Sequence, residues 1–193
     1  MTKIKVNQRP TFYPMPAALI GSIVDGKPNF MLCTWLSRIN REPPVWMVSI
    51  NKKHYTMKGI KENQAFSINF PSADLVKETD YCGITSGKEQ DKTSKFSIFY
   101  GETKIPMIKE CVLNIEFLIN DIIEFPDHFL ALGNAINSYS DESYLTDDTP
   151  DIQKMNPIIY TGNHFDYWSI GEKLGDAFTI GKELKNEFRV LML

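Results

Sequence analysis

The sequence lacks the motifs that mark self-contained catalytic machinery. It contains no G-x-x-x-x-G-K-[ST] loop, no G-x-G-x-x-G turn opening a helix and no G-x-S-x-G elbow. These gaps argue against a P-loop, a Rossmann dinucleotide site and a nucleophilic serine of the hydrolase type. The three histidines, His54, His128 and His164, stand at no metal-ligand spacing with a carboxylate or a cysteine. The chain is therefore a binding protein, or an enzyme whose cofactor carries the chemistry.

Basic charge, cysteine and long apolar runs are also scarce. The 21 Lys and Arg residues are outnumbered by 24 Asp and Glu, and the net charge of −3 excludes the basic face of a nucleic-acid binder. The three cysteines, Cys33, Cys82 and Cys111, are odd in number and widely spaced, which predicts a reducing compartment and no disulfide framework. No apolar run approaches 18 residues and the N-terminus has no signal-peptide core. We therefore expect a cytoplasmic protein without a membrane span.

The sequence is rich in short β-type runs. Its 193 residues, 42% of them apolar, suit a single domain over residues 1–193 with a full core. Residues 17–24 and 29–36 flank Asp25-Gly26, a dipeptide that favours a two-residue hairpin turn. Further strands are expected at residues 44–50, 65–70, 96–101, 111–121 and 128–141, and two short ones within residues 157–171.

Two short helices interrupt the predicted strands. Residues 54–63 form one, with Thr56 as its N-cap and Gly59 weakening its middle. Ser72 is a plausible N-cap for the second. The acidic segment 140–154 has no core pattern and is expected to be a surface loop. The expected class is all-β with short helices, as a barrel or a sandwich.

Two of the later runs carry further detail. Between residues 113 and 119, Leu, Ile, Phe and Ile alternate with polar residues that include Asn114 and Glu116, the pattern of a half-buried strand. Gly133 lies within the predicted partner strand and indicates a bulge or a close approach.

Three local features could bind a ligand. Lys52, Lys53 and His54 precede the helix that Thr56 would cap, and a helix N-terminus with neighbouring cations suits a monophosphate. The alternative is a solvated basic loop with an ordinary cap. In the polar loop at residues 85–95, Ser86 and Gly87 offer a hydroxyl and an open backbone, and Lys92 offers a charge. The alternative there is a flexible surface loop.

The third feature is the strand end at Thr34, Trp35 and Ser37. The Trp could form the wall of a planar ligand's site, although a Trp at a strand end is more often a core or interface residue.

Taken in order, these segments resemble the flavin reductase-like family, and within it the flavoredoxin branch. The resemblance runs through residues 27–72, 80–92, 105–117 and 127–142 and the closing residues 167–184. It implies a Greek-key type, FMN-binding split β-barrel that forms a homodimer and holds FMN near the subunit interface.

The resemblance also implies site residues. Thr34 and Trp35 match the strand end beside the flavin ring, and Asn69 and Phe70, with Pro71, match a turn that lines it. The phosphate loop and the loop that closes over the cofactor correspond to Ser49, Lys53, His54, Thr56, Ser86, Gly87 and Lys92. No catalytic side chain and no metal ligand is implied.

This chain departs from the family in two places. Relatives often carry Arg in the phosphate-loop region, where this chain has Asn51, Lys52 and Lys53, and Lys binds phosphate as a point charge without a bidentate fork. After His128, a frequent family histidine, the strand reads Gly-Asn-Ala where relatives usually have Gly-Glu-Val.

Three functions follow from the resemblance. The first is an NAD(P)H-dependent FMN reductase, in which the nicotinamide cofactor is the electron donor. The second is an FMN-binding electron carrier that acts with a protein redox partner. The third is a barrel of this fold that binds another ligand. The sequence predicts no nucleic-acid and no membrane partner.

Overall fold

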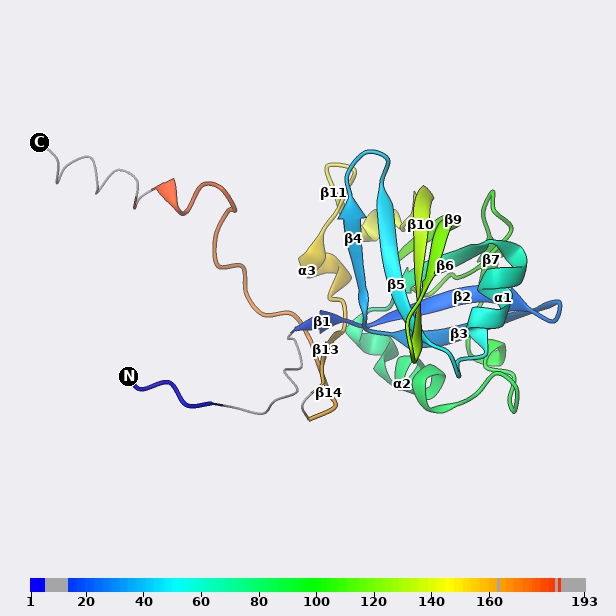
Figure 1. The fold of residues 1–193 in the computed structure, drawn as a ribbon. Coiled ribbons are helices and arrows are strands. Elements are labelled where there is room, and N and C mark those ends of the chain that lie inside the picture. The colour runs from blue at the N-terminus through cyan, green and yellow to red at the C-terminus, as the bar shows by residue number, and fades with distance from the viewer. Residues whose placement is uncertain (6–13, 163, 183, 185–193) are drawn as a thin grey trace, which may run out of the picture.

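The chain folds around one long antiparallel sheet that curls into a barrel (Figure 1). The computed structural model describes residues 1–5, 14–162, 164–182 and 184. The order of strands in the main sheet is β3-β2-β6-β9-β10-β5-β4. These strands are β2 (Ala18–Val24), β3 (Lys27–Cys33), β4 (Leu36–Asn40), β5 (Val45–Asn51), β6 (Ala65–Phe70), β9 (Leu113–Glu124) and β10 (His128–Tyr139).

Smaller elements surround the main sheet. A second sheet joins β1 (Met15–Pro16), β13 (Ile159–Thr161) and β14 (Asp166–Trp168). Two short pairs are formed by β7 (Ile98–Tyr100) with β8 (Pro106–Ile108), and by β11 (Leu145–Thr146) with β12 (Thr149–Pro150). The helices are α1 (Thr56–Asn63), η1 (Ala73–Leu75), α2 (Val76–Ile84), η2 (Thr93–Lys95), η3 (Glu142–Tyr144) and α3 (Ile152–Met155).

The predicted hairpin at the start of the chain is present. Strands β2 and β3 pair from Ala18 with Cys33 to Val24 with Lys27. Asp25 and Gly26 form the turn with φ angles of 50° and 76°, the positive values that an Asp-Gly turn supplies.

The barrel interior is closed by aromatic and branched side chains. Phe66 and Phe117 stack with ring centroids 4.8 Å apart, and both are fully buried. Gly133 permits this packing, because a Cβ there would lie 2.7 Å from the Phe66 ring. The β9–β10 register also shifts at this glycine, so the predicted bulge and the predicted close approach both occur.

Helix α1 differs from its predicted form at two residues. Thr56 is its first residue and not its cap; Tyr55 holds the cap position without a side-chain hydrogen bond. Gly59 serves packing, because a Cβ there would lie 2.2 Å from the Ile23 carbonyl oxygen of β2. The helix therefore lies directly on the sheet, and the glycine permits the approach.

Strand β9 is not half-buried as its alternation predicted. Asn114 and Glu116 are 3% and 0% exposed. Residues 101–108 cover their face: Thr103 hydrogen-bonds Glu116, and Asn114 donates to the Ile108 carbonyl oxygen. The acidic segment 140–154 also has more structure than a loop, since it holds η3, the β11–β12 pair and α3.

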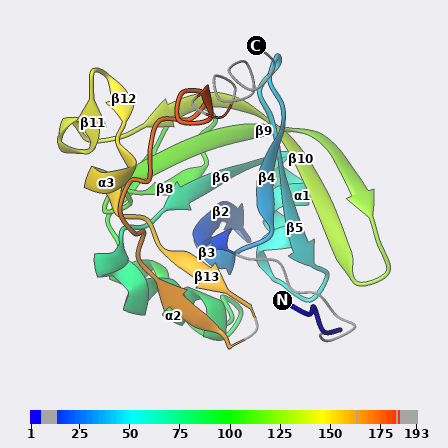
Figure 2. The ribbon, with the colours of Figure 1, turned by 90° about the vertical axis from the view of Figure 1, so that its left-hand side faces the viewer.

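The last described residues leave the body of the protein. Residues 169–184, called the arm below, extend away from the barrel beyond β14 in Figure 1, on the side that faces the viewer in Figure 2. Residues 171–182 and residue 184 are all exposed. No helix among the described residues is long and apolar enough to cross a membrane.

Candidate functional site

A groove made of three adjoining hollows runs along one side of the barrel. The cationic hollow, about 210 Å³, shares Met31 and His54 with a middle hollow of about 180 Å³. The middle hollow shares Thr34, Trp35, Ser49 and His128 with an apolar hollow of about 710 Å³. The shared residues make the three hollows one continuous groove, of the size range that small-molecule sites occupy.

The cationic hollow holds a buried lysine. Lys92 is 4% exposed, and its ammonium donates to the carbonyl oxygens of Cys82 and Thr85 at 3.2 and 3.0 Å. No carboxylate in the described part of the chain forms an ion pair with it. Burial lowers the pKa of Lys92, because the charged form is deprived of water. A buried cation without a counter-ion, facing a hollow, favours an anion in that hollow.

The start of helix α1 forms one wall of the cationic hollow. The Asn51 carbonyl oxygen accepts from the His54 N–H at 3.0 Å, and the Asn51 side chain accepts from the Lys53 N–H at 3.0 Å. These bonds turn the chain so that helix α1 begins at the hollow, where a first helical turn offers N–H groups to an anion. The lining includes Lys53 as well as Lys92, and no Asp or Glu.

The opposite wall is the loop that carries Ser86 and Gly87. A Cβ on Gly87 would lie 2.0 Å from the Asn29 side-chain oxygen, so only glycine allows the loop to pack this closely. Asn29 in turn donates to the Thr56 hydroxyl at 2.7 Å. The loop, strand β3 and helix α1 are therefore held together at Asn29.

His54 lies where the cationic and middle hollows meet. Burial lowers the pKa of His54, and the charges of Lys92 and His128 lower it further. The lowered pKa favours a neutral imidazole at physiological pH.

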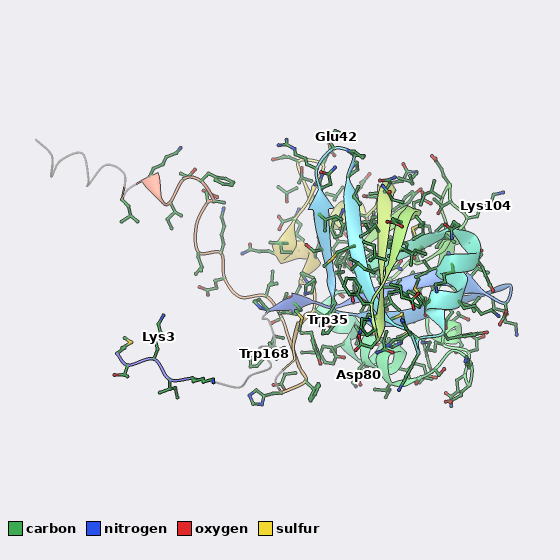
Figure 3. The ribbon with its side chains drawn as sticks, viewed as in Figure 1. Lys3, Trp35, Glu42, Asp80, Lys104 and Trp168 are labelled. Atoms are coloured by element: carbon green, nitrogen blue, oxygen red, sulfur yellow. The ribbon has the colours of Figure 1, made fainter. Side chains whose placement is uncertain are left out.

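Trp35 lines both the middle and the apolar hollows and lies on the side of the body from which the arm extends (Figure 3). Its ring stacks on His128 with centroids 5.2 Å apart and 25° between the planes, and it is 51% exposed. The Trp35 carbonyl oxygen accepts from the Ser49 N–H at 2.8 Å, which fixes the break between β3 and β4 against β5. An exposed aromatic plane beside an apolar hollow suits a flat ring.

Most of the residues expected at the site lie together. The cationic and middle hollows bring together Thr34, Trp35, Ser49, Lys53, His54, Thr56, Ser86, Gly87 and Lys92. Asn69 and Phe70 do not line the three hollows. Asn69 is 0% exposed and its amide bonds Leu19, Ser67, Ile108 and Asn114. Its polar atoms are thus used inside the barrel, and Phe70 packs edge-on against Trp46.

Several lining residues were not expected from the sequence. Asn29 and Tyr55 line the cationic hollow, and Met47, Phe125 and Leu130 line the apolar one. Asn29 alone carried a signal, because it is a polar residue within an otherwise apolar strand. Met47 and Leu130 join the groove through the pairing of β5 with β10.

The groove can bind and orient, and its own side chains offer little acid–base chemistry. Its cationic and middle hollows contain no carboxylate, and the described residues include no cluster of three metal-ligating side chains. An elongated molecule with an anionic end and a flat apolar end matches its two ends.

Comparisons with known proteins agree with this geometry. Residues 10–169 match the family described as flavin reductase like domain. A flavoredoxin from Methanosarcina acetivorans has a similar structure, with a TM-score of 0.92 and 47% identity over 95% of this chain and 100% of that one. Flavoredoxin of Desulfovibrio vulgaris (Miyazaki F) follows with a TM-score of 0.88 and 34% identity over 93% of this chain and 100% of that one.

A more distant structure shares the fold alone. The FMN-binding protein from Thermus thermophilus, with bound p-hydroxybenzaldehyde, has a TM-score of 0.77 and 24% identity, over 91% of this chain and 99% of that one. The predicted all-β split barrel with short helices is confirmed by these likenesses.

Proposed function

We propose, because this chain belongs to the flavin reductase-like family, that it binds FMN in the groove and exchanges electrons through it. The observation that carries the proposal is Lys92, a buried ammonium that faces the cationic hollow without a carboxylate partner among the described residues. FMN has one phosphate at one end and one flat ring at the other, which matches the polarity of the groove.

The residues present fit FMN. Lys92 and Lys53 supply charge for the phosphate, and the start of helix α1 with Thr56 and Ser86 supplies hydrogen-bond donors. Thr34, Trp35 and Ser49 would hold the ring at the middle hollow. When bound, FMN supplies a ring that accepts a hydride or electrons and passes them on. The protein then has only to bind, orient and leave one face of the ring accessible.

An electron carrier of the flavoredoxin type is the first candidate role. The two flavoredoxins match 95% and 93% of this chain at 47% and 34% identity, which supports that role above others. The electron donor or acceptor would then be a redox protein. An NAD(P)H-dependent FMN reductase is the second candidate, and the open apolar hollow of about 710 Å³ supports it by offering room beside Trp35 for a nicotinamide ring.

We also propose that two copies pair and that they reside in the cytoplasm. Exposed apolar side chains, among them Trp35, Ile39 and Phe125, lie on the strands and the hairpin beside the groove, and such patches mark association surfaces. The free, buried thiols of the three cysteines suit a reducing compartment.

The test of FMN binding compares FMN with riboflavin, which lacks the phosphate. Titration of the flavin-free protein, followed by flavin fluorescence, should give a Kd for FMN roughly 30-fold below that for riboflavin, since charge-assisted phosphate bonds add about 2 kcal/mol. Lys53→Ala and Thr56→Ala should each narrow this gap, and Lys95→Ala, an exposed lysine outside the hollow, should not. Equal affinity for the two flavins in the unaltered protein would refute the phosphate site.

Steady-state assays separate the two roles. A reductase should oxidise NADH or NADPH in the presence of FMN at about 1 per second or faster. A carrier should retain FMN through gel filtration and oxidise neither nicotinamide at such a rate. FMN lost on gel filtration, together with rapid NAD(P)H oxidation, would overturn the carrier role.

A further inference from the structure

We propose that the arm of one copy lies over the apolar hollow of a second copy, so that each flavin site is completed by its partner. The proposal rests on the proposed function, since it concerns the ring end of the same groove. It adds a specific segment, residues 169–184, and a specific occupant, a second copy of this chain.

The arm carries large apolar side chains that its own copy leaves in solvent. Leu174 and Phe178 are 93% and 96% exposed, and Ile180 and Leu184 are 55% and 62% exposed. In a soluble chain, such a concentration of exposed apolar residues marks a surface that binds something. Leu174 lies in an irregular stretch, and Phe178 lies in the turn at residues 177–181 that follows it.

The arm is held by its own residues alone. Within the described residues, its hydrogen bonds and its ion pair join positions of the arm to one another, as in the Ile180 N–H to the Asp176 carbonyl oxygen and in the Lys173–Asp176 ion pair. A locally shaped segment with no described hydrogen bond to its own barrel is free to lie on another surface.

The root of the arm, in contrast, is fixed. The Tyr167 hydroxyl donates to Asp80 of helix α2 at 2.8 Å, and the Trp168 indole N–H donates to Thr161 at 3.1 Å. Figure 3 places Trp168 and Asp80 on the side of the body that Trp35 also occupies. From this root the chain runs outward, away from its own barrel (Figure 1).

The apolar hollow begins beside this root. Met15 and Pro16 of β1 line the hollow, and β1 pairs with β13, which pairs with β14. Trp35 and Phe125, also in its lining, are 51% and 49% exposed. Arm and hollow therefore lie on the same face, and both are apolar.

A dimer with two-fold symmetry would cover the apolar side chains of both arms and both apolar hollows. In an isologous dimer each contact occurs twice, so a copy that sends its arm outward from this face also receives an arm on it. The arm of the second copy would bring Leu174 and Phe178 to the hollow and shield the open side of the ring from water.

The comparisons with known proteins show that the arm extends beyond the family domain and has a counterpart in a solved flavoredoxin. The family match ends at residue 169, where the arm begins. The Methanosarcina acetivorans structure nevertheless covers 95% of this chain, which leaves uncovered fewer residues than residues 170–193 contain. Part of the arm thus has a counterpart in that structure.

The test uses two kinds of altered copy. The arm variant, Leu174→Ser with Phe178→Ser, keeps its groove; Lys92→Met keeps its arm. Co-expression with two different affinity tags and purification on both yields mixed dimers. We expect the arm variant alone to bind FMN roughly tenfold more weakly, from the loss of two buried apolar side chains. The mixed dimer should bind one FMN per dimer with unaltered affinity, because the Lys92→Met copy lends its arm to the intact groove.

Three results would overturn the inference. The first is a mixed dimer without a site of unaltered affinity, as expected if each arm serves its own groove. The second is an arm variant that binds FMN as tightly as the unaltered protein. The third is an unaltered protein that sediments as a monomer at the concentration of the binding assay.

The controls separate this inference from the proposed function. Glu172→Ser, a polar substitution in the arm, should leave FMN affinity unchanged. Absence of FMN binding by the unaltered protein would count against the proposed function itself. Normal FMN binding with no effect of the arm variant would count against the arm alone.

Discussion

The barrel buries two charges of opposite sign, and their surroundings differ. The Glu116 carboxylate is 0% exposed and accepts hydrogen bonds from the side chains of Thr103, Asn137 and Tyr139 and from the N–H groups of Glu102 and Thr103. Lys92 is 4% exposed and donates only to two carbonyl oxygens of the described residues. One charge is fully satisfied within the protein, and the other faces a hollow.

Their pKa values show the same contrast. Burial alone would raise the pKa of Glu116, but the hydrogen bonds from Thr103, Tyr139 and Asn137 outweigh it and lower the pKa to about 2. Burial also lowers the pKa of Lys92, and there the change disfavours the charge. A buried charge that is hydrogen-bonded on all sides stabilises the fold, whereas one left partly unsatisfied beside a hollow is available to a ligand.

The largest expected effect is on the fold. Glu116→Gln should lower the free energy of unfolding at pH 7 by about 3 kcal/mol, since the pKa of the carboxyl falls from 4.5 to about 2 on folding. Urea unfolding of the flavin-free variant and of the flavin-free unaltered protein measures this difference in unfolding free energy. The Kd for FMN of the folded variant should not change, because Glu116 lies outside the groove.

The effect of Glu116 should disappear in acid. A group with a lowered pKa stabilises the fold above its unfolded pKa, and this contribution is lost as the pH falls from about 4.5 to about 2. The variant and the unaltered protein should therefore converge only below about pH 2. Glu124→Gln, at an exposed ion pair with Lys52, is the control and should cost less than about 1 kcal/mol. A loss of FMN affinity in Glu116→Gln would contradict the assignment of Glu116 to the stability of the fold and of Lys92 to ligand binding.

The second effect is on the ligand. Lys92→Met should raise the Kd for FMN roughly 30-fold, from the loss of about 2 kcal/mol of charge-assisted bonding, while the Kd for riboflavin stays nearly constant. The unfolding free energy of the flavin-free protein should change by less than about 1 kcal/mol, because an apolar side chain of similar length replaces a partly satisfied charge. Destabilisation as large as that of Glu116→Gln would show Lys92 to be structural.

Alkaline pH should reproduce part of the Lys92 effect. The ammonium is needed for the phosphate, so the ratio of the riboflavin Kd to the FMN Kd should fall as the pH rises through the lowered pKa of Lys92, below 10.5. Any titration of the flavin ring cancels in this ratio. The flavin-free protein should gain stability over the same window, since its unfolded state binds that proton more tightly. A ratio that stays constant as the pH rises from 7 to 10.5 would contradict this assignment.

The smallest effects come from two glycines. Gly87→Ala should displace Asn29 from Thr56 and weaken FMN binding roughly fivefold, about 1 kcal/mol. Gly26→Ala has open space around its Cβ but a φ of 76°, so it should lower stability by about 1 kcal/mol and leave FMN affinity unchanged. Fluorescence titration measures the Kd for FMN and urea unfolding measures the stability of both variants. A weaker FMN affinity in Gly26→Ala, or an unchanged FMN affinity in Gly87→Ala, would contradict the prediction.

Much of the barrel could be predicted from local patterns. The Asp25-Gly26 turn and the strands on either side follow from residue preferences that act over a few positions. The burial of Glu116 could not be predicted this way. Its alternation with apolar neighbours indicates a solvent-facing side chain, and only the passage of residues 101–108 across that face buries it.

The site shows the same division. The family resemblance predicted Lys92 as a cofactor-binding residue, but the polar segment around it has the composition of a surface loop. Its burial depends on the end of α2, where the carbonyl oxygens of Cys82 and Thr85 meet its ammonium. The expected role of Asn69 at the ring is not supported, because the strand places its amide inside the barrel among β2, β8 and β9. The hypothesis of a cap at Thr56 was wrong for a similar reason, since its hydroxyl faces Asn29 of another strand.

The thiol of Cys33 has a consequence for the chemical durability of the groove. Its sulfur donates to the carbonyl oxygens of Trp35 and Ser49, and burial raises its pKa to about 12. Peroxides and disulfides react with thiolates, which this sulfur does not form at any physiological pH. The Cys33 sulfur, beside the proposed flavin site, should therefore take no part in the redox chemistry and should stay unmodified through repeated oxidation and reduction of the flavin.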